Sequence, residues 1–233
     1  MRIAIISDIH GNIEALRQAL DIIGELGTDE IVCLGDIVGY GPDPEPCVDL
    51  IRKHCKTVIM GNHDNAVIDM SATENFNPVA KQAVWWTHQQ LSPESLSFLQ
   101  GLPYRNQRQD LLFVHASPMN PAKWTYLFTI NDALPEFDAF QERICFVGHT
   151  HSPRVFCNSP HATAITREFQ FIINVGSVGQ PRDGDARLSF GLFDTEKWDY
   201  KNIRSEYDVQ TTARKTRERG LPVILAERLL RGR

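Results

Sequence analysis

The chain opens with the stretch Arg2-Ile3-Ala4-Ile5-Ile6-Ser7-Asp8-Ile9-His10, a short β-branched run that ends on an aspartate and a histidine. Its apolar residues do not alternate with polar ones, a pattern typical of a strand that is covered on both faces. In open α/β sheets, ligands bind beyond the carboxyl ends of the strands. The stretch therefore predicts a buried strand that delivers Asp8 and His10 to a site.

Four further stretches repeat this order of apolar residues followed by a side chain that binds metals. They end at Asp36, at Asn62 and His63, at His115, and at His149 and His151. Glycine precedes the polar residue at positions 35, 61 and 148, where it allows a tight turn and a close approach of the backbone. One such residue alone is typical of a helix cap, whereas five strand ends together predict one shared site.

Length, charge and cysteine usage predict a cytoplasmic protein. We expect one α/β domain over residues 1–233, with a helical extension from about residue 209, because 233 residues suit a single buried core. The five cysteines show no Cys-x-x-Cys spacing, as expected of core residues in a reducing compartment. The first strand leaves no room for a signal peptide, and no apolar run approaches the ~20 residues that span a bilayer.

The net charge of -5 argues against a long nucleic acid as partner, because such binding usually rests on a basic surface. The one basic stretch, residues 214–219, also contains Glu218 and fits a solvated helix face. Nothing in the pattern calls for a membrane partner.

The spacing of apolar and capping residues predicts three helices in the first half of the chain. They begin after Asn12, at Pro44 and after Ser92. From about residue 153 we expect a β-rich half that forms a second sheet packed on the first, with strands over 154–157, 162–166, 169–175, 188–195 and 200–205. An amphipathic helix over 221–230 docks either on the body of the protein or on another subunit. The second alternative would make the protein a homo-oligomer.

The donor types at the strand ends predict two divalent metal ions. Carboxylate and amide oxygens mixed with imidazole nitrogens suit Mn, Fe, Co, Ni or Zn better than an all-oxygen magnesium cage, and we expect Mn first. Seven ligands are too many for one tetrahedral ion but fit two ions that share a carboxylate. They are Asp8, His10, Asp36, Asn62, His115, His149 and His151. An anionic phosphate ester would balance the surplus positive charge.

The motifs at these strand ends resemble, in order, the five motifs of the calcineurin-like metallophosphoesterases. They are Asp8-Ile9-His10, Gly35-Asp36-Ile37-Val38-Gly39, Gly61-Asn62-His63-Asp64, Val114-His115 and Gly148-His149-Thr150-His151. Residues 174–182 resemble the Asn-Pro-Gly-Ser loop of the small bacterial phosphodiesterase branch, with Val175 where that branch usually has proline. The resemblance implies a four-layer α/β/β/α sandwich, in which two mixed β-sheets are flanked by helices.

The resemblance also implies roles for individual residues. Asp8, His10 and His151 would hold one metal, Asn62, His115 and His149 the other, and Asp36 would bridge them. A metal-bridging hydroxide would attack phosphorus while His63 assists the leaving group. Asp64 would orient the ring of His63. The alternative for His63 is a histidine that caps its own turn.

Substrate contacts are less well defined by the sequence. Arg182 is a candidate for binding phosphate, and the alternative is a salt bridge to Asp183 or Asp185. Tyr40 lies in the loop over residues 39–44, and Trp124, Tyr126 and Phe128 lie in the loop over residues 118–140; we expect both loops over the site. These aromatic side chains either stack a nucleobase or belong to the core.

These observations favour a dinuclear-metal phosphoesterase that hydrolyses a small phosphodiester or a nucleotide phosphoanhydride. A phosphomonoesterase or protein phosphatase is the second hypothesis. A non-catalytic metal-binding scaffold is the third, and it is disfavoured because His63 and every candidate ligand are present.

Overall fold

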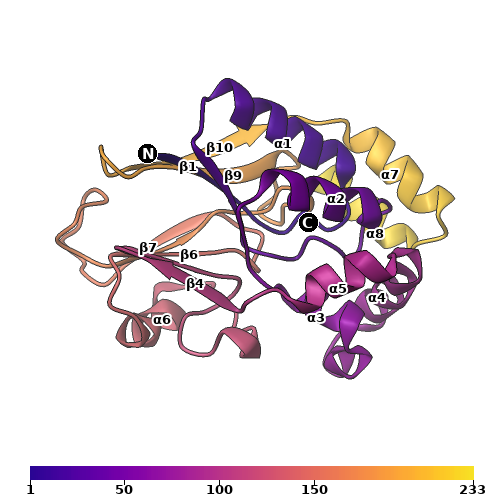
Figure 1. The fold of residues 1–233 in the computed structure, drawn as a ribbon, viewed down its shortest axis with the longest axis horizontal. Coiled ribbons are helices and arrows are strands. Elements are labelled where there is room, and N and C mark those ends of the chain that lie inside the picture. The colour runs from indigo at the N-terminus through magenta and orange to yellow at the C-terminus, as the bar shows by residue number, and fades with distance from the viewer.

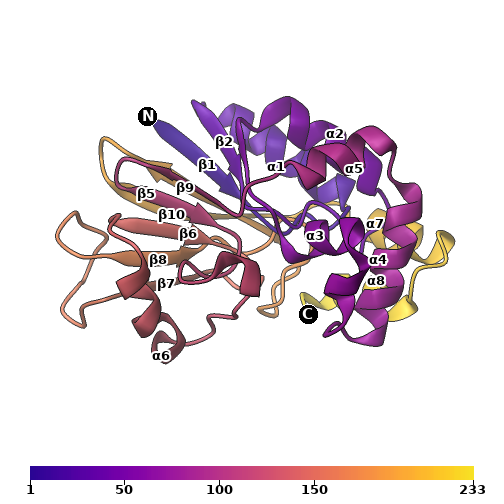
Figure 2. The same cartoon turned by 60° about the horizontal axis from the view of Figure 1, so that its bottom comes forward.

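The computed structural model describes residues 1–233 and contains two five-stranded mixed sheets (Figures 1 and 2). The first sheet has the order β10-β9-β1-β2-β3 and consists of β1 (Arg2–Ile6), β2 (Glu30–Cys33), β3 (Thr57–Val58), β9 (Leu188–Asp194) and β10 (Asp199–Ser205). The second has the order β4-β5-β6-β8-β7 and consists of β4 (Arg105–Arg108), β5 (Leu111–Val114), β6 (Ile144–Val147), β7 (Arg154–Cys157) and β8 (Phe171–Asn174). Strands β1, β2 and β3 are mutually parallel, as are β5, β6 and β8, whereas the edge strands β10, β4 and β7 pair antiparallel.

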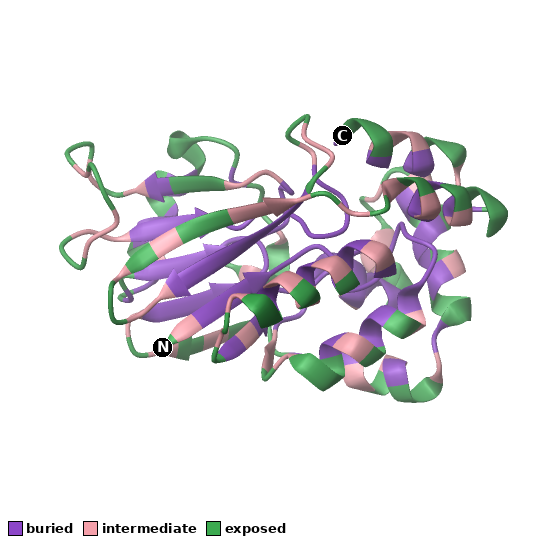
Figure 3. Ribbon diagram, turned by 90° about the horizontal axis from the view of Figure 1, so that it is seen from above, coloured by how far each residue is buried: buried purple, intermediate pink, exposed green.

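Side chains that alternate along β1 show how the layers are held together. Ile3 and Ile5 pack between the two sheets, in one cluster with Phe113 and Phe146 of the second sheet. Ala4 and Ile6 point the other way and belong to the cluster beneath the helices. The inner strands are accordingly buried along most of their length, whereas the edge strands β10, β4 and β7 are largely exposed or half-buried (Figure 3). The expected four-layer α/β/β/α sandwich is confirmed.

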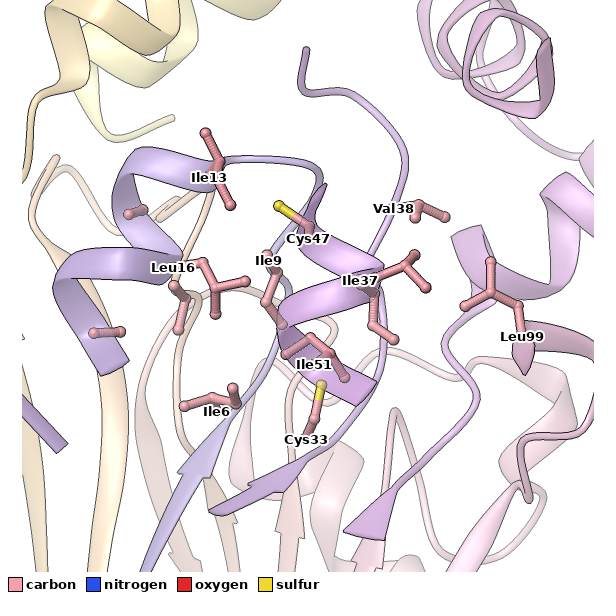
Figure 4. Packing of buried hydrophobic residues seen from close by; sticks show 14 of the residues in the cluster. Ile6, Ile9, Ile13, Leu16, Cys33, Ile37, Val38, Cys47, Ile51 and Leu99 are labelled. Carbon is pink, nitrogen blue, oxygen red and sulfur yellow. The ribbon is translucent and has the colours of Figure 1, made fainter. Parts of the chain in front are cut away.

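The helices on the first sheet form because their apolar residues recur on one face. Asn12 accepts a hydrogen bond from the amide of Ala15 and so caps α1 (Ile13–Glu25), which is followed by α2 (Pro44–His54). Ile13 and Leu16 of α1 are directed towards Ile9, alongside Cys47 of α2 (Figure 4).

The other helices cover the end of the first sheet and the outer face of the second. They are α3 (Asn62–Ile68), η1 (Met70–Thr73), α4 (Pro78–Gln90), α5 (Pro93–Gln100), η2 (Pro121–Lys123), α6 (Ile130–Ala133), η3 (Leu134–Ala139), α7 (Val209–Glu218) and α8 (Val223–Arg231). Helices α3 and α4 were not expected. The buried positions of α4 are mostly small residues such as Ala80 and Ala83, so the helix has no strong apolar stripe in the sequence.

Two expectations about the second half of the chain are wrong. It does not form the second sheet by itself, because β9 and β10 extend the first sheet beside β1, while β4, β5 and β6 come from residues before 153. Residues 162–166 are not a strand but part of an irregular loop. A β-rich composition predicts strands but not the sheet that each strand joins, since pairing depends on contacts between distant segments.

Two further expectations are confirmed. Leu225 and Leu229 of α8 are buried, so this helix docks on the body of the protein. All five cysteines are free, and Cys33, Cys47 and Cys145 are buried. No helix combines the length and the apolar character that crossing a membrane requires.

Candidate metal centre

The ligand candidates meet where strands of both sheets end. Asp8 follows β1 and Asp36 follows β2 in the first sheet, whereas His115 follows β5 and His149 follows β6 in the second. Two groups form, each with its donor atoms within 4.8 Å of one another: Asp8, His10, Asp36 and His151, and Asp36, His115 and His149. Both groups are buried and they share Asp36.

The carboxylate of Asp36 lies between the two groups. Its Oδ2 is 3.6 Å from Nε2 of His10 and 3.4 Å from Nε2 of His115. Its Oδ1 accepts a hydrogen bond of 2.8 Å from the amide of His63. The backbone therefore fixes one oxygen of Asp36, while the other faces both groups of donors.

Backbone carbonyls determine which nitrogen of each histidine carries the proton. The pairs are His10 Nδ1 with Val38 O at 3.0 Å, His115 Nδ1 with Leu34 O at 2.9 Å, His151 Nδ1 with Gln180 O at 2.6 Å, and His149 Nε2 with Trp124 O at 3.0 Å. Since a carbonyl only accepts, the imidazole nitrogen that faces it must donate. In the neutral form of each ring, the opposite nitrogen then carries a lone pair, as a metal ligand requires.

Several buried acceptors in the centre lack a partner. Oδ1 of Asp8, Oδ1 of Asn62 and Nε2 of His115 make no hydrogen bond. The Nε2 atoms of His10 and His151 lie 3.1 Å apart, although the tautomers above leave a lone pair on each. Buried acceptors without donors are costly, and a cation among them removes that cost. The donor set therefore fits divalent metal ions.

The backbone at the ligands is held in an unusual conformation. The φ angle is positive at Asp8 (54°), His10 (49°), Asp36 (51°), His149 (66°) and His151 (58°). Residues other than glycine rarely adopt this left-handed region, and such strain of about 1–3 kcal/mol each concentrates at functional sites.

Two glycines allow the ligand loops to approach one another. A Cβ atom on Gly61 would collide with the backbone nitrogen and the carboxylate of Asp36. A Cβ atom on Gly148 would collide with Oγ of Ser7 and would lie 2.5 Å from Oδ2 of Asp8. The expectation that glycine before a ligand permits close approach is confirmed at both positions.

Burial and mutual charges shift the pKa values of the ligands. Burial acts to raise the pKa of Asp36, but His115, His63 and His10 outweigh it and hold the pKa well below its ordinary value. Burial acts to lower the pKa of His115, but Asp36 and Asp8 raise it to about 9. Burial, followed by the charge of His115, lowers the pKa of His149 to about 3. Because a metal competes with protons for these atoms, cation binding at His115 would release a proton.

His63 lies in the first turn of α3, beside the ligands. Its ring centroid is 4.4 Å from that of Tyr40, 4.9 Å from that of Phe76 and 5.0 Å from that of His10. Burial lowers the pKa of His63 to about 4, although the negative charge of Asp36 opposes this shift. The Nδ1 atom of His63 has no hydrogen-bond partner.

Asp64 makes no hydrogen bond to the ring of His63, contrary to the expectation that it orients that ring. Its carboxylate accepts hydrogen bonds from the amides of Ile37 at 2.9 Å, Val38 at 3.2 Å and Gly61 at 3.1 Å. Burial raises the pKa of Asp64 to about 7, and the nearby charge of Asp36 adds to the effect. Asp64 thus ties the loop after Asp36 to the start of α3, because the backbone amides of both loops converge on it.

Arg182 forms neither of the two salt bridges considered for it, since Asp183 pairs with Arg204 and Asp185 pairs with Arg187. Its guanidinium donates to Oε1 of Gln180 at 2.6 and 3.2 Å and lies 5.5 Å from the ring centroid of Tyr40. No carboxylate neutralises Arg182, so its charge is available to an anion.

Tyr40 is 7% exposed, and its ring also packs edge-on against His10, with the centroids 4.8 Å apart. The ring is thus covered on several sides. It supports His63 and Arg182 and has no free face for an external base.

The C-terminal helices hold the loops that carry Tyr40 and Arg182. Lys215 of α7 makes ion pairs with Glu14 and with Asp43, 2.9 Å away. Leu221 and Leu225 pack in one cluster with Tyr40. The amide of Gly184, two residues after Arg182, donates to the carbonyl of Gly232 at 2.9 Å.

Several contributors to the centre were not predicted from the sequence. The carbonyl groups of Trp124 and Gln180 each orient a histidine. The side-chain amide of Asn174 donates to Oγ1 of Thr150 at 2.9 Å and to the carbonyl of Gly148, which secures the turn with His149 and His151. Asn174 and Gln180 lie in the 174–182 loop noted above, whereas a backbone carbonyl leaves no signal in a sequence.

Comparisons with known proteins show the family of the chain. Residues 1–198 match the family model described as the calcineurin-like phosphoesterase superfamily domain. An uncharacterized protein of Methanocaldococcus jannaschii is 39% identical over 99% of this chain and 98% of its own length. The crystal structure of a metallophosphoesterase from Sphaerobacter thermophilus is 40% identical, covers 100% of this chain and 99% of that one, and superposes with a TM-score of 0.89.

The phosphodiesterase YfcE of Escherichia coli is 26% identical over 84% of this chain and 89% of its own. The family depends on divalent metal ions, and the clustered donors described above provide candidate ligands for them. The chain therefore belongs to the calcineurin-like phosphoesterase superfamily and is a hydrolase of phosphoric esters.

Proposed function

We propose that the protein hydrolyses a small phosphodiester or a nucleotide phosphoanhydride at a centre of two divalent metal ions. The observation that carries the proposal is the position of Asp36, whose Oδ2 faces the donors of both ligand groups. Unpartnered acceptors on Asp8, Asn62 and His115 support it further. Positive charge placed among these acceptors would remove the cost of burying them without a partner.

The proposed ligand sets follow the two groups, with Asn62, which belongs to neither group, added to the second. Asp8, His10 and His151 would hold one ion, Asn62, His115 and His149 the other, and Asp36 both. Manganese is proposed first. The mixed oxygen and nitrogen donors also accept Fe, Co, Ni or Zn. When bound, the ions would activate a water nucleophile and neutralise the charge of the phosphoryl group.

The protein side chains near the ions would position the ester and assist its leaving group. We assign to His63 an N–H that donates to the leaving-group oxygen, because its ring lies beside the ligands. Arg182 would hold a phosphate oxygen, since no carboxylate pairs with it. The ring of Tyr40 would hold His63 and Arg182 in position by packing against both.

A substrate panel combined with metal analysis tests this function. Protein purified with Mn²⁺ should contain two divalent ions per chain and hydrolyse bis-nitrophenyl phosphate or diadenosine tetraphosphate faster than nitrophenyl phosphate. The reverse preference would identify a phosphomonoesterase. A preparation that binds no metal and is inactive on all three compounds would contradict the proposal and favour a scaffold.

We also propose a partner and a cellular compartment. The partner we propose is a small phosphate ester or nucleotide. The five free cysteines support a reducing compartment such as the cytoplasm.

A further inference from the structure

Two exposed aromatic rings continue outward from the metal centre. The ring of Tyr126 stacks on the ring of His149, with the centroids 4.0 Å apart and the planes at 26°. The ring of Phe128 stacks on Tyr126, with the centroids 5.3 Å apart and the planes at 3°. Tyr126 and Phe128, called here the aromatic ledge, therefore begin directly against a candidate metal ligand.

The ledge is open to solvent although it consists of large apolar groups. Tyr126 is 46% exposed and Phe128 is 54% exposed. Parallel rings with this centroid separation are offset, so each ring leaves part of a face uncovered. Aromatic faces of this kind bind other planar aromatic groups, and stacking a base is worth about 1–3 kcal/mol in proteins that bind single strands.

The segment that carries the ledge is anchored at both ends. Before it, the carbonyl of Trp124 accepts a hydrogen bond from His149, and Trp124 itself has a left-handed φ of 56°. After it, the carboxylate of Asp132 accepts hydrogen bonds from the amides of Phe128 at 3.1 Å and Thr129 at 2.8 Å. The rings are thus held in place before a ligand arrives, which lowers the entropy cost of binding.

The ledge and the residue proposed to bind phosphate both contact the turn that carries His149 and His151. Tyr126 stacks on His149, and the amide of Arg182 donates a hydrogen bond of 3.1 Å to the carbonyl of His151. A nucleotide separates its base from its phosphate by one ribose. A phosphate at the metal centre and a base on the ledge are therefore compatible with a single small ligand.

We propose that the aromatic ledge of Tyr126 and Phe128 is the binding site for the base of a nucleotide substrate, which makes the enzyme selective for nucleoside phosphate esters. The inference rests on the proposed function, because it places the phosphate of the same ligand at the metal centre. Of the aromatic side chains considered from the sequence, Trp124 and Tyr40 serve the fold, whereas Tyr126 and Phe128 are exposed to solvent.

Equilibrium binding tests the ledge without relying on turnover. Calorimetric titration of the Mn²⁺-loaded protein compares adenosine 5′-monophosphate with ribose 5-phosphate, two ligands that differ only in the base. We expect the nucleotide to bind about 5-fold or more tightly. Phe128→Leu keeps an apolar side chain but removes the ring, and it should bring the ratio close to one, whereas Phe128→Trp should preserve it.

A matched control is Trp85→Leu, which removes a 60% exposed aromatic ring from α4 and should leave the ratio unchanged. Equal affinities in the wild type, or a ratio that Phe128→Leu does not change, would overturn the proposal. Ile130 and Leu134 nearby are also exposed, at 43% and 48%. A loss of self-association in Phe128→Leu with an unchanged ratio would therefore assign the ledge to an interface between copies of the chain.

Hydrolysis of bis-nitrophenyl phosphate, measured on the same preparations, separates this inference from the proposed function. Turnover without a preference for the nucleotide contradicts only the ledge. Preferential binding without turnover contradicts only the proposed hydrolysis.

Discussion

The ligands of the metal centre and the residues around its rim are held in place by different means. The four ligand histidines each donate to a backbone carbonyl, and the ligand loops carry left-handed residues packed against glycine. Tyr40 and Arg182 at the rim rest instead on the side chains of Leu221, Leu225 and Gln180.

The difference indicates which parts of the molecule set which property. The ligands lie within residues 1–198, which match the family model, so the chemistry belongs to the shared fold. Helices α7 and α8 lie beyond that range and contact the rim. We therefore expect changes at the ligands to abolish turnover, and changes at the rim and its supports to alter substrate binding and stability.

The largest effect is expected from Asp36→Asn, which keeps the shape of the side chain but removes the charge that faces both ligand groups. Metal ions supply several kcal/mol of transition-state stabilisation, so kcat should fall on the order of 10³-fold. Bound metal, measured by mass spectrometry, should fall below two ions per chain. The exposed Asp199→Asn serves as control, and full metal content in Asp36→Asn would show that Asp36 is not shared.

His63→Ala should separate binding of metal from catalysis. Loss of a proton donor typically costs about 10²–10⁴-fold, so kcat on an alkyl ester should fall by on the order of 10²-fold, and by less on a nitrophenyl ester, whose leaving group needs little help. Metal content should not change. Equal losses on the two esters would indicate that His63 has no role at the leaving group.

Asn174→Ala tests whether the turn with His149 and His151 is preorganised by its neighbours. The substitution removes the hydrogen bonds to Thr150 and to the carbonyl of Gly148. Loss of such an outer contact typically weakens metal affinity by about 10–100-fold. Competition with a chelator measures this affinity, and an unchanged value would mean that the backbone alone maintains the turn.

The smallest effect is expected from Lys215→Met on α7. The substitution leaves Glu14 and Asp43 without their cation, which should lower the free energy of unfolding by about 1–3 kcal/mol. Urea denaturation measures this change. Arg214→Met on the same helix removes an exposed pair with Glu218 and should change stability by less than about 0.5 kcal/mol. Equal effects of the two would mean that Lys215 does not tie α7 to the loop of Tyr40.

Local patterns predicted β1, β2, β5 and β6, which precede ligands, because burial on both faces leaves an unbroken apolar run. The expected strand before Asn62 is reduced to the half-buried β3, and Asn62 begins α3 instead. The same patterns missed α4, whose buried residues are mostly small, and placed a strand over residues 162–166 that does not form. The local patterns also did not predict which sheet each strand joins. Strands β9 and β1 pair although nearly the whole chain separates them, and no local period encodes such a contact.

By itself, the sequence determined the donor types, their order and their position at strand ends, because hydrophobic pattern and ligand chemistry are both local properties. Only the tertiary structure decided that these ends come from two different sheets, that one oxygen of Asp36 faces both groups and that Arg182 keeps its charge unpaired. The tertiary structure also decided that Asp64 accepts hydrogen bonds from backbone amides and that Tyr126 and Phe128 are exposed to solvent. Each of these outcomes depends on distances and burial among residues far apart in the chain, and these are set only when the two sheets pack together.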